Sequence, residues 1–225
     1  GDPQRQKIVP SFLDEMNGYR TIAHESEIEI VIKKSRFIGY AFLVSSAEEA
    51  NEKLAALRKR QWDASHHCSA YVLGADKQLQ KYSDDGEPQG TAGMPILQVL
   101  HHKDVTNTMV VVVRYFGGVL LGAGGLVRAY SEAAAKALDA AGLCQYVPVV
   151  RWGFAVDYAH WARLDRFLQS SDIQLEQTDY GAEVLCQGLS REEAWESFRQ
   201  ALYNHCDGRV EVQFAEHAIA PWPID

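Results

Sequence analysis

The feature that most constrains the fold of this chain is the run Met109-Val110-Val111-Val112-Val113, which continues through Arg114 to Tyr115. A near-continuous apolar run of this length is typical of a central strand that is buried on both faces. Five glycines follow between positions 117 and 125, and an alanine-rich segment comes after them. The run therefore predicts an α+β domain in which a sheet packs against helices.

Hydrophobic periodicity places further elements in the first half of the chain. The expected strands are 27–33, 37–44, 68–73 and 109–115, and the expected helices are 46–60, one beginning near Pro95, and one from about Leu126 to Ala141. Residues 81–93 and 117–125 are predicted to be loops, because both segments are rich in glycine.

The pattern changes near residues 143–148, where we place a domain boundary. The second half predicts strands 149–156, 173–178, 182–187 and 209–214 and helices 160–170 and 190–206, the order βαββαβ of a ferredoxin-like domain. The predicted organisation is a flexible lead-in over 1–24, a first domain over 25–145 and a second over 146–225 with an extended tail.

Charge and cysteine content narrow the function classes. The first 146 residues are nearly neutral, whereas residues 147–225 carry 6 Lys and Arg against 13 Asp and Glu, so phosphate binding is expected only from local patches in the first half. No apolar run approaches a membrane span, so no membrane partner is expected. Four cysteines without a C-x-x-C pair or a signal-peptide core indicate reduced thiols and a cytoplasmic location.

The segment 84–93 is the first candidate site. Asp84, Asp85 and Glu87 offer three carboxylates for acid–base or divalent-cation chemistry, and Thr91 and its glycines offer donors to an anion at the start of the next helix. The alternative is a surface turn, since Asp, Gly and Pro are also the residues that turns require. The ligand spacing of a calcium loop is absent.

The glycine-rich segment after the central strand is the second candidate, because backbone amides there can hold a phosphate or carboxylate. Its candidate ligand residues are Arg114, Tyr115, Gly117, Gly118, Gly122, Gly124, Gly125, Arg128 and Tyr130. The arginines would pair with an oxyanion, and the aromatic residues, with Phe116, would stack on a base. The alternative is a tight turn that brings strand and helix together. Neither nucleotide-binding glycine motif is present, so no cofactor is predicted.

His66 lies two residues before Cys68, the first residue of the predicted strand 68–73, so their side chains share one face if the strand extends back to residue 66. This arrangement allows a Cys–His pair or a pair of metal ligands. A strand edge with a buried cysteine explains the same residues, so no metal site is predicted. Lys33-Lys34-x-Arg36 is a short basic cluster that would either contact phosphate or remain solvated.

Several separated motifs together resemble the IMPACT/YigZ family. They are Lys34-Ser35-Arg36-Phe37-Ile38, His66-x-Cys68-x-Ala70, Asp84-Asp85-Gly86-Glu87-Pro88, Gly90-Thr91-Ala92-Gly93-x-Pro95, and the run from Val110 to Gly118 that continues from Leu121 to Tyr130. The resemblance is strong from about Glu25 to Gly142 and extends over the second half in pattern only.

The resemblance implies a first domain like domain 2 of ribosomal protein S5 and a second domain like the last domain of elongation factor G. Eukaryotic members dampen a starvation-sensing kinase of translation initiation and carry an RWD domain, for which the first 24 residues are too few. The resemblance is therefore to a bacterial member, for which it implies a nucleic-acid or ribosome-linked binding role in translation regulation.

Three functional hypotheses follow. The first is a binding protein with RNA or the ribosome as partner; the second is an enzyme acting on a small anionic or phosphorylated substrate; the third is a protein-interaction module. No nucleophile–base pair stands at a recognisable spacing, so the sequence favours binding over catalysis. A joint site requires the two candidate loops to meet in one cleft.

Overall fold

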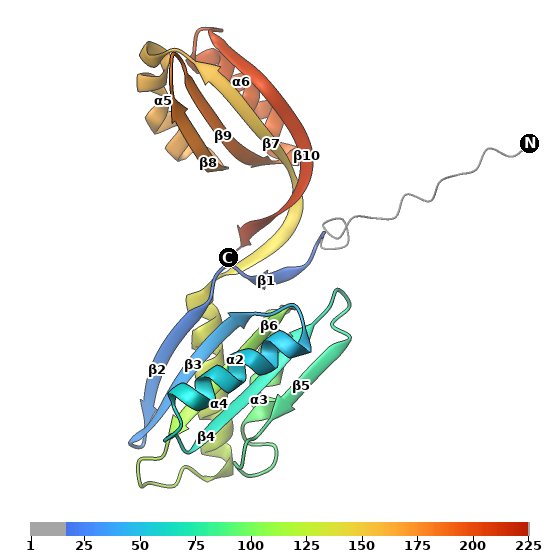
Figure 1. Cartoon of the computed structure of the whole chain (residues 1–225), viewed down its shortest axis with the longest axis vertical. Coiled ribbons are helices and arrows are strands. Elements are labelled where there is room, and N and C mark those ends of the chain that lie inside the picture. The colour runs from blue at the N-terminus through green and yellow to red at the C-terminus, as the bar shows by residue number, and fades with distance from the viewer. Residues whose placement is uncertain (1–16, 225) are drawn as a thin grey trace, which may run out of the picture. The chain divides into compact units, whose positions relative to one another are not determined.

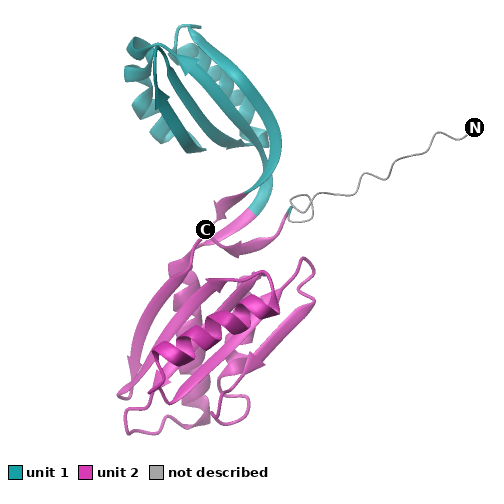
Figure 2. Cartoon of the chain, viewed as in Figure 1, with its two compact units in different colours: residues 1–17, 146–220 teal, residues 18–145, 221–225 magenta. Residues whose placement is uncertain are grey.

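The computed structural model describes residues 17–224 and divides the chain into two compact α+β units. The first unit comprises residues 18–145 with the C-terminal end from residue 221, and the second comprises residues 146–220 (Figure 2).

The first unit contains a five-stranded sheet in the order β2-β3-β6-β4-β5, with every neighbouring pair antiparallel. Its strands are β2 (Ser26–Ile32), β3 (Ser35–Leu43), β4 (His66–Leu73), β5 (Leu79–Ser83) and β6 (Thr108–Tyr115), and its helices are α2 (Ala47–Arg60), α3 (Gly93–Lys103) and α4 (Gly122–Ala141). Helix α2 covers one face of the sheet, and α3 and α4 cover the other (Figure 1).

Strand β6 lies at the centre of the sheet, as the apolar run predicts. Val110 and Val112 face the core under α3 and α4, whereas Val111 and Val113 face the core under α2. The same alternation sends Arg114 toward α4 and Tyr115 toward α2. The register of this strand therefore decides which side chains can reach a common site.

The two largest differences from the sequence prediction in the first half concern α4 and β5. Helix α4 begins at Gly122 instead of Leu126, so half of the predicted glycine loop is the first turn of a helix. The alanine face of α4 is buried against the sheet, and this packing outweighs the low helix propensity of glycine. Residues 79–83, predicted in part as loop, form the exposed edge strand β5.

Part of the predicted lead-in is also structured. Arg20–Ile22 forms strand β1, which pairs with residues 143–145 at the start of β7 (Leu143–Val156). Ile22 is buried, and the Arg20 guanidinium donates a hydrogen bond to the Lys103 carbonyl. Three residues are too short a strand to show a period in the sequence. The remainder of the predicted lead-in, residues 1–16, lies outside the described residues.

The second unit has the predicted βαββαβ order. After β7 come α5 (Tyr158–Ser170), β8 (Ile173–Tyr180), β9 (Val184–Arg191), the 3₁₀ turn η1 (Glu192–Ala194), α6 (Trp195–His205) and β10 (Val210–Ile224). The strand order is β10-β7-β9-β8, with both helices on one face (Figure 1). Strand β10 continues past the predicted end at Phe214, because an edge strand tolerates Pro221 and Pro223.

Membrane-spanning helices and cysteine pairing were both addressed from the sequence. Within residues 17–224, none of the helices is both long enough and apolar enough to cross a lipid bilayer. All four cysteines are buried and free.

Candidate functional site

The two candidate loops converge on one pocket in the first unit. The pocket has a volume of about 500 Å³ and lies between the β5–α3 loop and the first turn of α4. Its apolar walls come mainly from Pro88, Phe116, Leu120, Leu121 and Leu126, and its polar lining comes from Ser65, His66, Glu87 and Arg114. The requirement for a shared cleft is therefore met.

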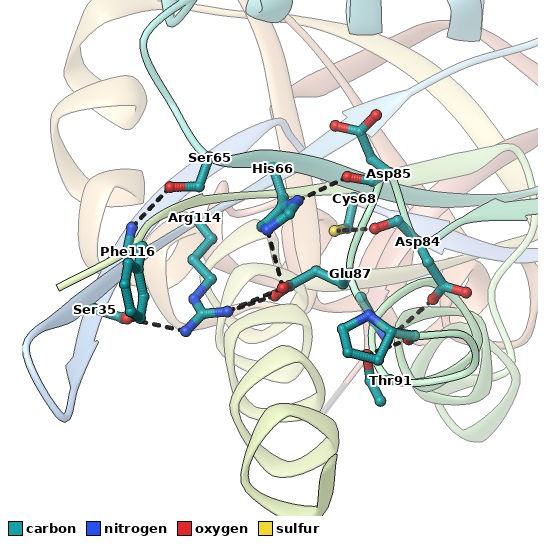
Figure 3. A network of polar contacts seen from close by, with 12 residues as sticks. Ser35, Ser65, His66, Cys68, Asp84, Asp85, Glu87, Thr91, Arg114 and Phe116 are labelled. Atoms are coloured by element: carbon teal, nitrogen blue, oxygen red, sulfur yellow. Dashed lines mark hydrogen bonds and ion pairs between the residues drawn. The ribbon is translucent and has the colours of Figure 1, made fainter. Parts of the chain in front are cut away.

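Glu87 and Arg114 form a buried ion pair on the pocket floor. Arg114 Nη1 lies 2.8 and 3.0 Å from the two carboxylate oxygens of Glu87, and both side chains are at most 6% exposed. Arg114 Nη2 donates to the hydroxyl of Ser35, whose oxygen also accepts from the Gly117 amide. The Tyr130 hydroxyl donates to the second Glu87 oxygen at 2.6 Å. Figure 3 shows the part of this network that joins Ser35, Arg114 and Glu87.

Aromatic rings complete the environment of the Arg114 guanidinium. Its central carbon lies 5.4 Å from the Phe37 ring centre and 5.5 Å from the Phe116 ring centre, distances at which cation–π attraction operates. Among the residues that the structure describes, none is a hydrogen-bond partner of Arg114 Nε. The predicted oxyanion ligand therefore already holds an internal carboxylate, and a free anion would have to compete with Glu87 for it.

His66 links the same carboxylate to the β5–α3 loop. Its Nδ1 lies 2.8 Å from the Asp85 carbonyl, which can only accept, so Nδ1 carries a proton. Its Nε2 lies 3.0 Å from the first Glu87 oxygen. His66 therefore joins the Glu87 carboxyl group to the backbone of the loop that carries Asp85.

Asp84 and Asp85 have structural partners outside the pocket. Asp84 accepts from the backbone amides of Gly90, Ala92 and Gly93, so its carboxylate takes the anion position predicted at the start of α3. Asp85 turns its carboxylate away from the pocket (Figure 3) and accepts from the His67 amide and from Arg58.

The hydrogen bonds to Asp85 also affect its protonation. Burial raises the pKa of the Asp85 carboxyl, but the bond from the His67 amide and the charge of Arg58 outweigh burial and hold the pKa below its ordinary value. The carboxylate therefore ties helix α2 and strand β4 to the loop.

Thr91, Cys68 and Tyr130 point inward and are not available at the pocket surface. Thr91 is buried and donates to the Pro88 carbonyl, which closes the turn before α3. The Cys68 thiol donates to the Asp84 carbonyl at 3.1 Å, and burial raises its pKa well above the ordinary value, which disfavours the thiolate. Burial raises the pKa of Tyr130 in the same way. The Cys68–His66 pair that the sequence allowed does not form, because Cys68 bonds to the Asp84 carbonyl and His66 contacts Asp85 and Glu87. The alternative interpretation, a strand edge with a buried cysteine, fits these contacts.

Two further candidates lie away from the pocket. Tyr115 is on the α2 side of the sheet, where its hydroxyl donates to Asp63 and its ring lies under Arg36. Arg128 is exposed and borders a second hollow. Neither Tyr115 nor Tyr130 can stack on a base in this pocket, and Phe116 is the aromatic ring of the predicted set that borders it.

The glycines of the second candidate segment have different roles. A Cβ on Gly117 would overlap the Lys34 carbonyl, so this position requires glycine for close approach. Gly118 and Gly122 have φ values of +86° and +74°, which other residues rarely adopt. Gly124 lies within α4 with room for a Cβ, whereas a Cβ on Gly125 would lie in tight contact, 3.1 Å from the Leu121 Cβ. The tight-turn interpretation thus accounts for the first three glycines.

Sequence reasoning missed Ser35 and Leu120. Ser35 is fully buried in a motif that was used only as a family marker, and nothing in its local pattern indicates that it contacts Arg114. Leu120 is 82% exposed, and the signal for it was the apolar triplet Val119-Leu120-Leu121 inside a glycine-rich turn. In the part of the chain that the structure describes, no group of three or more His, Cys, Asp or Glu side chains is arranged to hold a metal ion.

Comparisons with known proteins cover both units. The model of the Impact N-terminal domain matches residues 33–138, and the model of a domain of unknown function, DUF1949, matches residues 154–209. The IMPACT family member YvyE of Bacillus subtilis is 36% identical over 89% of this chain and 93% of that protein. The IMPACT family member YigZ of Escherichia coli is 40% identical over 68% of this chain and 76% of that protein.

A solved structure supports the fold. The crystal structure of a hypothetical protein is 34% identical and covers 88% of this chain and 97% of its own, with a TM-score of 0.56.

Proposed function

This chain belongs to the IMPACT family, and from that premise we propose that it is a cytoplasmic binding protein of translation whose partner docks on the pocket of the first unit. One observation carries the proposal: Phe116 and Leu120 stand 49% and 82% exposed at the border of an apolar pocket. Large apolar side chains that gather in this way are typical of an interaction site.

The polar groups of the pocket support recognition over chemistry. Each carboxylate of the segment 84–93 accepts hydrogen bonds from backbone or side-chain donors that hold the fold together. A general base needs a lone pair directed at a substrate, and these groups use theirs internally. We therefore assign them to shaping the pocket.

A protein partner fits the pocket better than RNA does. Of the residues predicted to grip RNA, Arg114 and Tyr130 are buried and Tyr115 lies on the other face of the sheet. The role in translation is the one that the family resemblance implies, so we expect the partner to be a ribosome-linked protein. On the basis of the same resemblance, we propose that the first unit has the fold of domain 2 of ribosomal protein S5 and that the second unit has a ferredoxin-like fold.

A second candidate, an enzyme acting on a small anionic substrate, is favoured by one observation. His66 and Glu87 line the pocket 3.0 Å apart, and a histidine beside a carboxylate is a common acid–base arrangement. A thermal-shift screen with phosphates and nucleotides tests this candidate, because a ligand of the native state raises its apparent stability.

Site-specific cross-linking tests the docking proposal. A photo-reactive amino acid replaces Leu120 in the full chain and, as the control, Leu79, which is 48% exposed on β5 and does not line the pocket. The expected result is a discrete protein adduct in ribosomal fractions from position 120 alone, lost when Phe116→Asp is added. Equal adducts from both positions, or ligand stabilisation in the thermal screen without any adduct, would reject the proposal.

A further inference from the structure

A second hollow adjoins the first pocket in the same unit. It has a volume of about 390 Å³ and lies between the turn that joins β2 to β3 and the helix α4. Lys33 comes from the turn and Arg128 from the helix. Leu121 lines both hollows, so one partner segment can occupy the first pocket and reach the second.

Three cations at or beside the second hollow have no ion-pair partner within residues 17–224. Lys33 and Arg128 line the hollow, and Lys34 is the exposed neighbour of Lys33 in the turn. None of the three forms a salt bridge or side-chain hydrogen bond in that range, whereas nearby Arg36 pairs with Glu29. Glu132 also lines the hollow, but its carboxylate is paired with Lys136 at 3.1 Å. The hollow therefore presents positive charge that the chain itself does not neutralise.

The backbone holds the two lysines in an unusual conformation. Lys33 and Lys34 have φ values of +45° and +69°, and a two-residue hairpin turn of this kind normally uses Asn-Gly. The Lys34 carbonyl packs directly on the Gly117 backbone, so the turn is fixed against the segment that carries Phe116 and Leu120. The positive charges are thus held close to the apolar pocket.

We infer that the partner is a protein segment that carries an apolar anchor for the first pocket and acidic side chains beside it for Lys33, Lys34 and Arg128. The inference rests on the proposed function and adds the chemistry of the partner. It is argued from charge complementarity at two hollows that share Leu121. RNA is disfavoured, because single-stranded nucleic acid needs several stacking rings and the first pocket offers Phe116 beside aliphatic walls.

Peptide selection tests the inference without a known partner. The immobilised full chain is used to select binding peptides from a random twelve-residue display library. Two control selections run in parallel, one on the support without protein and one on the Leu120→Asp protein. The expected result is enrichment of sequences with an apolar anchor next to Asp or Glu, and loss of that enrichment with Leu120→Asp. An enriched apolar anchor without acidic neighbours overturns this inference and leaves the docking site standing. Absence of any Leu120-dependent sequence overturns both.

A charge-neutral variant tests the role of the cations directly. K33N/K34G/R128Q removes the three charges and gives the turn its preferred residues; K59Q/K81Q/R60Q removes three charges elsewhere in the same unit. One exposed ion pair changes affinity by about 1.4- to 5-fold, so the first variant should weaken an enriched acidic peptide roughly tenfold in fluorescence polarisation.

The control variant should leave the affinity of that peptide within about twofold, and the difference between the two should shrink in 0.5 M salt. Equal weakening by both variants would show a non-specific charge effect and overturn the inference. A filter-binding result would also overturn the inference if the wild type binds single-stranded RNA more tightly than the peptide and K33N/K34G/R128Q no longer binds the RNA.

Discussion

Replacing Glu87 with glutamine keeps the size of the side chain and removes its charge from the pocket floor. The Arg114 guanidinium then remains buried, at 6% exposure, without a counter-ion. Removing one partner of a buried ion pair costs about 3–5 kcal/mol, because the remaining charge stays desolvated. The low exposure of both side chains means that solvent screening does not reduce this figure much.

The matched control is Asp139→Asn, which breaks the pair between Asp139 and Lys103 in the same unit. These side chains are 63% and 26% exposed, and a pair of this kind contributes about 0–1 kcal/mol. The double variant E87Q/R114M removes both charges, so we expect it to be less destabilised than the sum of its single variants by about 2 kcal/mol.

The assay should report the first unit by itself. Trp152, Trp161 and Trp195 lie in the second unit, whereas Trp62 and Trp222 lie in the first, so tryptophan fluorescence mixes the signals of the two units. Amide hydrogen exchange of Val110 to Val113 as a function of urea follows opening of the central strand instead. The reasoning is refuted if E87Q costs less than about 1 kcal/mol, or if the single effects add to the double within about 0.5 kcal/mol.

Three further perturbations have definite expected outcomes. Gly117→Ala forces a Cβ into the Lys34 carbonyl and should lower the free energy of unfolding by about 2–3 kcal/mol. Gly124→Ala lies inside α4, where the Cβ is unobstructed, and should raise that free energy by about 0.5–1 kcal/mol. Urea unfolding followed by circular dichroism distinguishes the two signs. Asp84→Ala removes the cap of α3 and should cost about 1–2 kcal/mol by the same measurement, with faster amide exchange confined to the first turn of that helix. The pKa of Asp85 is lower in the folded state than in the unfolded state, so its contribution to stability is complete above the unfolded-state pKa of about 3.9 and is lost as the pH falls through the folded-state pKa. Asp85→Asn should therefore make the free energy of unfolding depend less steeply on pH in the acid range. An unchanged pH dependence would contradict this assignment.

The sequence predicted those parts of the fold in which burial follows a simple period. The run 109–113 identified the central strand because both of its faces are covered, and the βαββαβ order of the second half followed from regular alternation. The start of α4 was predicted four residues too late, because glycine-rich residues are typical of loops. The packing of the alanines that follow decides where this helix begins. Strand β5 was missed because it is an exposed edge without an apolar face.

The candidate site was predicted as two segments but not as a set of partners. Glu87 and Arg114 were both candidates, yet their pairing depends on the register of β6 beside β4, which brings together residues 27 positions apart. Ligand binding was one of two hypotheses for these carboxylates, beside a surface turn. Asp84 bonds to backbone amides of its own loop, and Asp85 bonds to the His67 amide on β4 and to Arg58 on α2. Composition cannot distinguish these uses, because both place acidic residues in a glycine-rich turn.

The convergence of donors on Glu87 has a consequence for the order of folding. Its carboxylate bonds to groups 21, 27 and 43 positions away, on β4, β6 and α4, and Arg114 in turn contacts Ser35 at a separation of 79. Contacts of such long sequence separation form slowly, because each requires closure of a long loop. Until all of these elements have assembled, desolvating the carboxylate is unfavourable. We therefore expect the pocket to be among the last features to form, so that a partner selects molecules whose first unit has completed folding.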